Sequence, residues 1–233
     1  MTLIHESMNR GHTDTGWLNS YHTFSFGGFQ DPTRMGFGAL RVINEDRIAP
    51  GSGFSEHGHA DMDILTLVLS GKLTHKDTLG NAVTIAPGEA QLMYAGSGVR
   101  HSEMNASGEK PAHFLQIWLI PDVRGGTPRY QQAALPAGEK SGSWSLLASG
   151  SGGEAALQLH SDTQLSLTTA RDGDRTPIPT RPGRIAFLHI IEGVAMLEGE
   201  RLATGDGVEI GDDQFDNLVW ATDGRALLFD MKR

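Results

Sequence analysis

The sequence contains no cysteine among its 233 residues. This excludes disulfides, iron–sulfur clusters and thiolate zinc sites, and it leaves His, Asp and Glu as the strong metal ligands. A basic balance is also lacking, because the formal net charge is −9 at pH 7. Non-specific binding to nucleic acid or to an anionic membrane depends on clustered Lys and Arg. We therefore expect neither a nucleic-acid partner nor a membrane partner.

Long apolar runs are missing as well. No stretch approaches the ~20 residues that a membrane-spanning helix requires. The first residues, MTLIHESMNRGH, lack the apolar region of a signal peptide. We expect a soluble, cytoplasmic protein, and we expect it to be a monomer.

What the sequence does contain is glycine, at 30 residues, together with short runs of Val, Ile and Thr. Few segments keep a helical period without Gly or Pro, although residues 130–140 are a candidate for a short turn of helix. This pattern favours an all-β fold. The runs with β character are 21–29, 38–51, 64–77, 83–96, 113–121, 157–170, 184–193, 207–213 and 225–231.

The chain divides near its middle, where residues 125–154 are rich in Gly, Ser, Ala and Pro. This composition predicts a connection between an N-terminal domain at 1–135 and a C-terminal domain at 136–233. Trp144 and the adjacent leucines indicate that part of the connection packs.

The two halves also resemble each other. VLSGKLTHKDTLGNAVTIAPGEAQLM matches IIEGVAMLEGERLATGDGVEI, pairing Gly71 with Gly193 and Gly88 with Gly205. Coincidence is the alternative, because strand–Gly–strand text recurs in any β protein. The same order of two hairpins favours a duplicated β unit.

The stretch FSEHGHADMD brings two histidines close together. If residues 54–69 form one strand, side chains at odd positions share a face, and the leucines among them place that face in the interior. His57 and His59 would then stand ~7 Å apart at the backbone and could converge on one ion. The alternative is a pair of surface histidines in a glycine-flanked loop.

A second cluster strengthens the metal hypothesis. GSGVRHSEMN places His101, Glu103 and Asn105 on one face after a Gly-rich turn. Together with His57 and His59, this cluster offers three neutral nitrogens and one carboxylate. Such a set suits Fe(II), Ni, Cu, Co, Mn or Zn and leaves room for water or substrate.

These segments resemble known motifs. GSGFSEHGHADMDILTLVLSG is similar to the first cupin motif and PGEAQLMYAGSGVRHSEMN to the second, in which His101 and Asn105 keep the H-x3-N spacing. More specifically, the chain resembles the pirin family, and within it the bacterial pirins described as quercetin 2,3-dioxygenases. The similarity is strong over the first half and holds only in pattern over the second. The segments that carry it are 10–26, 35–46, 57–71, 95–105 and 116–121.

The resemblance implies a bicupin, with two jelly-roll-like β-barrels, a short linker and one metal ion in the N-terminal barrel. By motif position the ligands are His57, His59, His101 and Glu103. General cupins take their glutamate from the first motif, where this chain has Asp63. The pirin pattern uses the carboxylate two residues after the second-motif histidine, so Asp63 is expected to be a supporting or core polar residue. Fe(II) is the expected ion, with other divalent ions as alternatives.

The activity that the resemblance implies is cleavage of the heterocyclic ring of a flavonol such as quercetin by O2, giving a depside and CO. In that chemistry the metal binds the deprotonated 3-hydroxyl, and Glu103 could accept its proton. The alternative is a metal-containing regulatory module that acts through a protein partner, as eukaryotic pirins are described.

The other histidines carry no predicted chemistry. His22, with Trp17, belongs to the pirin signature and is expected to be structural, and His75 is expected to be solvated in a polar hairpin. The histidines expected to be structural further along the chain are His113, His160 and His189.

The second barrel is expected to bind no metal. Counting from Gly193 and Gly205 shows which residues replace the four ligands, and none of them can take that role. These positions are Pro179, Arg181, Leu218 and Trp220.

Overall fold

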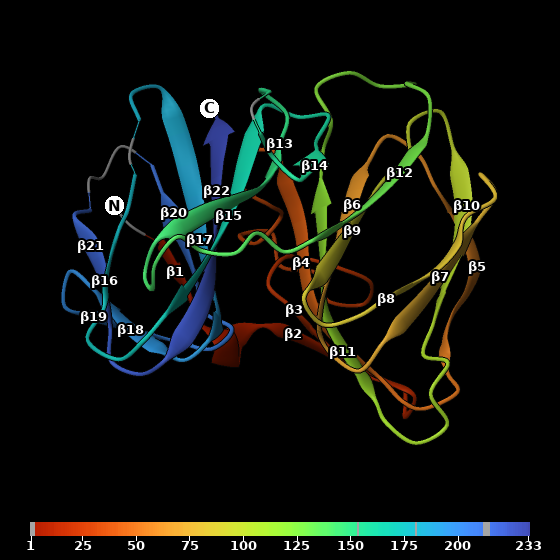
Figure 1. Ribbon diagram of the computed structural model, residues 1–233, viewed down its shortest axis with the longest axis horizontal. Helices are drawn as coiled ribbons and strands as arrows, with labels where there is room; N and C mark the ends of the chain where they lie inside the picture. The colour runs from red at the N-terminus through yellow and green to blue at the C-terminus, as the bar shows by residue number, and fades with distance from the viewer. Residues whose placement is uncertain (1–2, 153, 180, 212–214) are drawn as a thin grey trace. The chain divides into compact units, whose positions relative to one another are not determined.

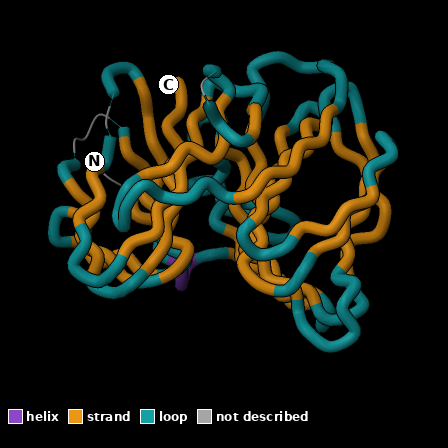
Figure 2. Tube along the Cα trace, viewed as in Figure 1, coloured by secondary structure: helices purple, strands orange, loops and turns teal. Residues whose placement is uncertain are grey.

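The computed structural model describes residues 3–152, 154–179, 181–211 and 215–233 (Figure 1). The acidic pair Asp212-Asp213, for which the sequence predicts a solvated turn, lies outside these residues. Strands dominate, and the helix in this part of the chain is a single 3-10 turn, η1 (Ser7–Asn9) (Figure 2). The all-β prediction is therefore confirmed. Within the described residues, no helix has the length and apolarity needed to cross a bilayer.

The chain folds as two units. The N-terminal unit comprises Gly11–Leu135 and Leu157–Ser161, and the C-terminal unit comprises Met1–Arg10, Pro136–Ala156 and Asp162–Arg233. The chain thus crosses between units more than once, whereas the predicted limits, 1–135 and 136–233, assume a single crossing. Those limits stay a prediction.

The N-terminal unit is built from two antiparallel sheets, in the orders β12-β9-β6-β11-β4-β3-β2 and β5-β10-β7-β8 (Figure 1). The strands of these two sheets are β2 (Gly11–Asp14), β3 (Leu18–His22), β4 (Leu40–Ile48), β5 (Gly53–His59), β6 (Asp63–Ser70), β7 (Leu73–Asp77), β8 (Ala82–Ile85), β9 (Glu89–Tyr94), β10 (Val99–Met104), β11 (Ala112–Leu119) and β12 (Arg129–Ala134). The two-residue strand β14 (Leu157–Gln158) also belongs to this unit but lies outside these two sheets.

The C-terminal unit repeats this plan, with sheets in the orders β1-β20-β17-β22-β15-β13 and β16-β21-β18-β19. Each unit is a pair of open sheets with jelly-roll-like topology rather than a closed barrel, and the bicupin prediction is confirmed. The strands of the C-terminal unit are β1 (Leu3–His5), β13 (Trp144–Ser149), β15 (Thr163–Ala170), β16 (Arg175–Pro177), β17 (Arg184–Glu192), β18 (Val194–Leu197), β19 (Glu200–Ala203), β20 (Gly207–Ile210), β21 (Asn217–Trp220) and β22 (Gly224–Lys232).

An apolar cluster joins the two sheets of the N-terminal unit. Leu73 and Ile85 project from the smaller sheet and pack with Ile48, Val68 and Phe114 of the larger one. All five side chains are almost fully buried. Burial of apolar side chains at this junction, worth roughly 1.5–3 kcal/mol each, holds the sheets face to face.

The paired glycines confirm the duplication at the level of the backbone. Gly71 and Gly193 both have positive φ, at 74° and 94°. A Cβ atom added to Gly71 would lie 2.4 Å from the Pro111 carbonyl oxygen, and one added to Gly193 would lie 2.5 Å from that of Asp223. Only glycine fits either position.

Two local predictions are wrong. Residues 54–69 form two strands, because the chain turns between β5 and β6, where Asp61 has φ 51°. Residues 130–134 belong to strand β12, which pairs with β9, rather than to a turn of helix.

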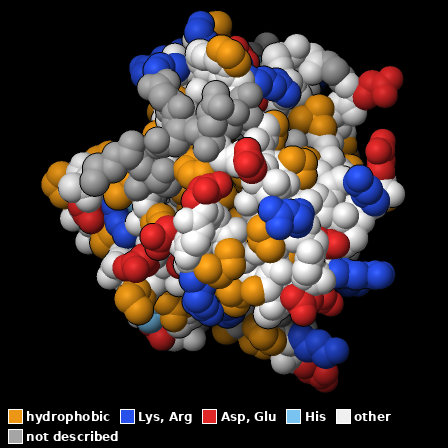
Figure 3. Space-filling view, turned by 90° about the vertical axis from the view of Figure 1, so that its left-hand side faces the viewer, with side chains coloured by type: hydrophobic (Ala, Val, Ile, Leu, Met, Phe, Trp, Pro, Cys, Tyr) orange, Lys and Arg blue, Asp and Glu red, His pale blue; other side chains and the backbone are white. Residues whose placement is uncertain are grey.

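On the face shown in Figure 3, acidic and basic side chains are interspersed rather than gathered by sign.

Candidate metal centre

Strands β5 and β10 bring the two sequence clusters together. They are antiparallel neighbours in which His101 lies opposite His57 and Val99 lies opposite His59. In β10 the odd positions are buried and Arg100 between them is exposed. The pleat of the strand therefore turns His101 and Glu103 into the unit.

Three imidazoles converge at this point. One ring nitrogen each from His57, His59 and His101 lies within 4.8 Å of the others. The ring centroids are 4.8 Å apart for His57 and His59, and 4.5 Å apart for His57 and His101. His57 Nδ1 lies 2.8 Å from the Ser55 carbonyl oxygen, which leaves its Nε2 free to bind an ion.

His101 shows the clearest sign of being a metal ligand. Its Nε2 is buried and has no hydrogen-bond partner among the described residues. A buried polar atom without a partner costs about 1–3 kcal/mol, and an ion would satisfy it. Burial, followed by the charge of His57, lowers the pKa of His101 to about 2 and that of His59 to about 4. Neutral imidazoles are the form that binds metal, so these residues fit a divalent ion.

Glu103 is fully buried between the two sheets and held by three donors. Gln116 Nε2 donates to Oε2 at 2.6 Å, while Gln91 Nε2 and Thr66 Oγ1 donate to Oε1 at 3.1 and 3.3 Å. Burial and the nearby charge of Asp46 raise the pKa of Glu103 to about 7, even though these hydrogen bonds act in the opposite direction. A carboxylate retains further lone pairs beside such bonds, so Glu103 can also bind a metal.

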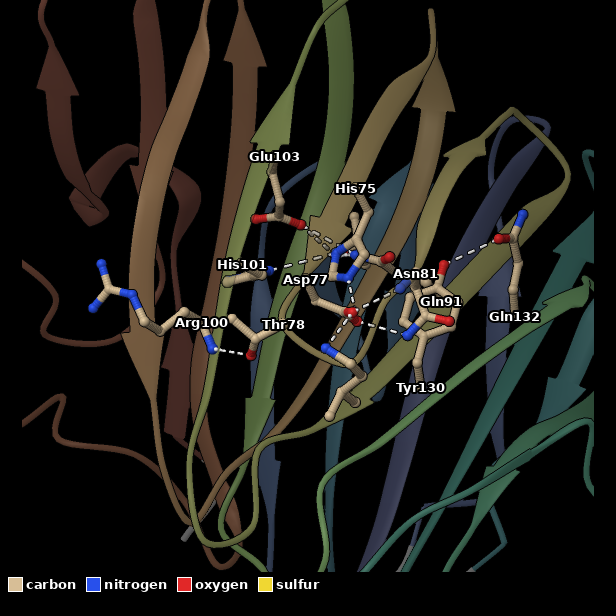
Figure 4. A network of polar contacts seen from close by, with 12 residues as sticks. His75, Asp77, Thr78, Asn81, Gln91, Arg100, His101, Glu103, Tyr130 and Gln132 are labelled. Carbon is tan, nitrogen blue, oxygen red and sulfur yellow. Dashed lines mark hydrogen bonds and ion pairs between the residues drawn. The ribbon is translucent and has the colours of Figure 1, made fainter.

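His75 belongs to this region, and its predicted solvation is wrong. Its side chain is fully buried, with Nε2 3.0 Å from Asp77 Oδ2. Ligand atoms of His75, His101 and Glu103 also lie within 4.8 Å of one another (Figure 4). Because one nitrogen of His75 bonds to Asp77 and the other faces His101 Nδ1 at 3.5 Å, His75 has no nitrogen left for an ion.

A cavity of about 460 Å³ opens onto His57, His59 and Glu103. Aromatic pairs form its walls. Trp17 and Phe54 meet edge to face at 5.3 Å, and Phe26 and Trp118 do so at 5.4 Å. The size is that of a typical small-molecule site.

One side of the cavity is polar, and sequence reasoning missed it. Ser20 Oγ donates to Asp46, and His22 Nδ1 lies 2.8 Å from Asn44 Oδ1. Burial raises the pKa of Asp46 to about 7. Alternating positions on β3 and β4 could have revealed this polar face, because Ser20 and His22 alternate as Asn44 and Asp46 do.

The other singled-out residues lie apart from the ligand cluster. Asp63 is a buried polar residue of β6 that accepts hydrogen bonds from the His160 backbone N–H at 2.6 Å and from its Nδ1 at 2.9 Å. His113 pairs with Glu45 at 2.9 Å. Asn105 donates to the carbonyl oxygens of Ile48 and Lys110 and so fixes the end of β10. Asp63, His113 and His160 therefore make contacts of the structural kind expected for them.

Two jelly-roll-like units, one of them with a cluster of imidazoles beside a buried carboxyl, define a bicupin with a candidate metal site. A family model described as pirin matches residues 4–119, and one described as the quercetinase C-terminal cupin domain matches residues 146–231. The chain belongs to the pirin family.

Relatives with known names are similar to this chain over nearly its whole length. It is 38% identical to a quercetin 2,3-dioxygenase of Escherichia coli (strain K12) over 231 residues, which is 99% of each chain. It is 39% identical to a pirin-like protein of Caulobacter vibrioides over 94% of this chain and 95% of that protein. The crystal structure of a bacterial pirin from Escherichia coli in complex with nickel(II) superposes with a TM-score of 0.94 at 38% identity, covering 100% of this chain and 99% of that one.

Proposed function

We propose that this protein is a metal-dependent dioxygenase that opens the heterocyclic ring of flavonols such as quercetin with O2, giving a depside and CO. The observation that carries the proposal is an aromatic-walled cavity with His57, His59 and Glu103 on its surface. The quercetin 2,3-dioxygenase of Escherichia coli supports the same substrate class.

In this proposal His57, His59, His101 and Glu103 hold one divalent ion. Three imidazole nitrogens and one carboxylate suit Fe(II), which we propose as the native ion, and also Ni(II), the ion in the related pirin structure. When bound, the ion would act as a Lewis acid and stabilise the deprotonated 3-hydroxyl of the flavonol.

Glu103 is the base that accepts the proton when the 3-hydroxyl ionises. Glu103 lines the cavity, and a carboxylate held within reach of a bound hydroxyl can act as its general base. Gln116 holds Oε2 from one side and Thr66 and Gln91 hold Oε1 from the other, so the carboxylate keeps a fixed orientation.

The cavity walls position the substrate. The edges of Trp17 and Phe54 on one wall, and of Phe26 and Trp118 on another, suit a planar aromatic ring and exclude bulk water from the reacting carbons. Polar side chains on β3 and β4, among them Asp46, can bind the remaining ring hydroxyls.

The test is oxygen uptake and CO release by Fe(II)-loaded protein with quercetin, with chelator-treated protein as the control. We expect one CO per O2 consumed, since the depside and CO together contain all atoms of quercetin and O2. No uptake by loaded protein would overturn the proposal and favour the regulatory alternative with a protein partner. The cytoplasmic location and the monomeric state stay predictions.

A further inference from the structure

Three buried side chains, His101, His75 and Asp77, form a line of polar contacts behind the three imidazoles (Figure 4). It follows from strand pairing. β7 runs beside β10, with His75 opposite Glu103 and Asp77 opposite His101. His75 and Asp77 are two residues apart and therefore point to the same, inner face as Leu73.

Asp77 is fixed by the turn that follows β7. The backbone N–H groups of Leu79 and Asn81 donate to Oδ1, both at 2.9 Å, and Asn81 Nδ2 donates to Oδ2 at 2.8 Å. A carboxylate with these donors is an acceptor only. The contact of 3.0 Å between Asp77 Oδ2 and His75 Nε2 is therefore donated by His75.

The proton on His75 Nε2 determines which of the other nitrogens of His75 and His101 carry protons. A neutral imidazole with its proton on Nε2 has an accepting Nδ1. That Nδ1 lies 3.5 Å from His101 Nδ1, so His101 must carry its own proton there. The proton-free atom of His101 is then Nε2, the buried nitrogen with no partner among the described residues.

We propose that Asp77 and His75 are positioning residues that hold His101 in the tautomer whose Nε2 lone pair faces the metal. The inference rests on the proposed metal site. Partners of this kind behind a ligating histidine typically change metal affinity by 10–100-fold. Tyr130 supports the arrangement, because its ring packs on that of His75 at a centroid distance of 4.8 Å.

Asp77→Asn is the central variant. The Asn81 and Leu79 backbone N–H groups keep the new amide oxygen on their side, so its NH2 group takes the place of Oδ2 and donates to His75 Nε2. The Asn81 side chain, which donates to Oδ2 in wild type, must then turn its amide oxygen toward this NH2 group. The proton of His75 then moves to Nδ1, and that of His101 moves to Nε2, where it blocks the metal. We expect the full-length, chelator-treated variant to bind Ni(II) about 10–100-fold more weakly than wild type.

Two matched variants separate positioning from loss of structure. Asn81→Ala loosens the same turn but leaves the His75–Asp77 bond, and we expect it to keep wild-type affinity. His75→Asn retains an acceptor near the place of Nδ1 and should bind Ni(II) better than His75→Leu, which retains none. Equal affinity in wild type, Asp77→Asn and His75→Leu would overturn the inference, as would equal weakening in Asn81→Ala and Asp77→Asn.

A second readout needs no metal and observes the wild-type protein directly. Long-range ¹H–¹⁵N correlation of wild-type protein, assigned with His101→Ala, reports which nitrogen of His101 carries the proton. We expect Nδ1, and a proton on Nε2 would overturn the inference directly. If His101→Ala leaves Ni(II) affinity unchanged, the proposed metal site fails, and the tautomer measurement still tests the hydrogen-bonded chain separately.

Discussion

The N-terminal and C-terminal units have the same strand order but differ in the polarity of matching interior positions. Strands β5-β10-β7-β8 of one correspond to β16-β21-β18-β19 of the other, and β4-β11-β6-β9 correspond to β15-β22-β17-β20. Counting from Gly71 and Gly193 agrees with the strand register, since Gln116 lies opposite Thr66 as Leu228 lies opposite Leu188. One scaffold therefore supports both a polar and an apolar interior.

The difference is concentrated around Glu103. The register places Leu218 at the position of Glu103. Glu103 lies opposite His75, the fourth residue after Gly71, and Leu218 lies opposite Leu197, the fourth residue after Gly193. The three side chains that donate to Glu103 are also replaced by apolar ones. Thr66, Gln91 and Gln116 correspond to Leu188, Val208 and Leu228, and all of these replacements lie in one buried apolar cluster.

This comparison shows that the polar interior is not required by the fold. Burying a carboxyl and its donors costs free energy that leucines avoid. The C-terminal unit lacks these buried polar groups and still folds, so their presence is a sign of function. They mark the N-terminal unit as the one with the candidate site.

The largest expected effect comes from removing the imidazoles. His57→Ala and His101→Ala should each lower the bound metal from one ion per chain to none, and oxygen uptake with quercetin should fall to the level of chelator-treated wild type. Elemental analysis after dialysis measures the metal. His12→Ala is the control, since His12 is exposed and stacks on Tyr21. Retention of one ion in both ligand variants would contradict the assignment.

The next effect concerns Glu103 alone. Glu103→Gln keeps the shape of the side chain but removes its charge and most of its basicity. If Glu103 takes the substrate proton, turnover should fall roughly 10²–10⁴-fold at equal metal content. The measurement is oxygen uptake with quercetin by variants adjusted to the same occupancy. Equal rates at equal occupancy would limit Glu103 to a ligand, and a loss restored by added metal would lead to the same conclusion.

Much of the candidate site could be predicted from short segments of the sequence. His57, His59, His101 and Glu103 alternate on two glycine-introduced strands, and an alternating pattern on a half-buried strand is a short-range signal. The same holds for Gly71 and Gly193, whose turns recur in both halves.

What could not be predicted depends on pairing between distant strands. His75 lies among Thr, Lys and Asp and looks solvated, yet it is buried because β7 pairs with β10, about 25 residues further along the chain. The turn at Asp61 has no glycine to announce it, and only its φ of 51° reveals it. Leu3–His5 pairs with β20, about 200 residues further along the chain, and this pairing leaves no local signal.

A smaller effect is expected from pH. Asp46, whose position in the C-terminal unit is the neutral Thr168, has a pKa raised by burial from 3.8 to about 7. Between these values the folded state binds more protons than the unfolded state, so stability falls as pH rises. Asp46→Asn removes this loss and should be more stable than wild type by as much as about 4 kcal/mol at pH 8, with little difference at pH 4.

Urea unfolding in the presence of chelator measures this difference. Asp172→Asn, at an exposed position of the C-terminal unit, is the control and should match wild type at both pH values. A gap between Asp46→Asn and wild type that is the same at pH 4 and pH 8 would show that Asp46 does not titrate in this range.

The smallest effect is an expected absence of change in the C-terminal unit. The sequence count pairs His101 with Leu218 and Glu103 with Trp220, and this is wrong by two residues. The strand register instead pairs Glu103 with Leu218 and His101 with Asp216. Asp216 is exposed, and one exposed carboxylate does not hold an ion through dialysis. Wild type and Asp216→Ala should therefore both retain one Ni(II) per chain after dialysis from excess, and His101→Ala should retain none. A second ion in wild type that Asp216→Ala loses would show that the apolar unit also binds metal.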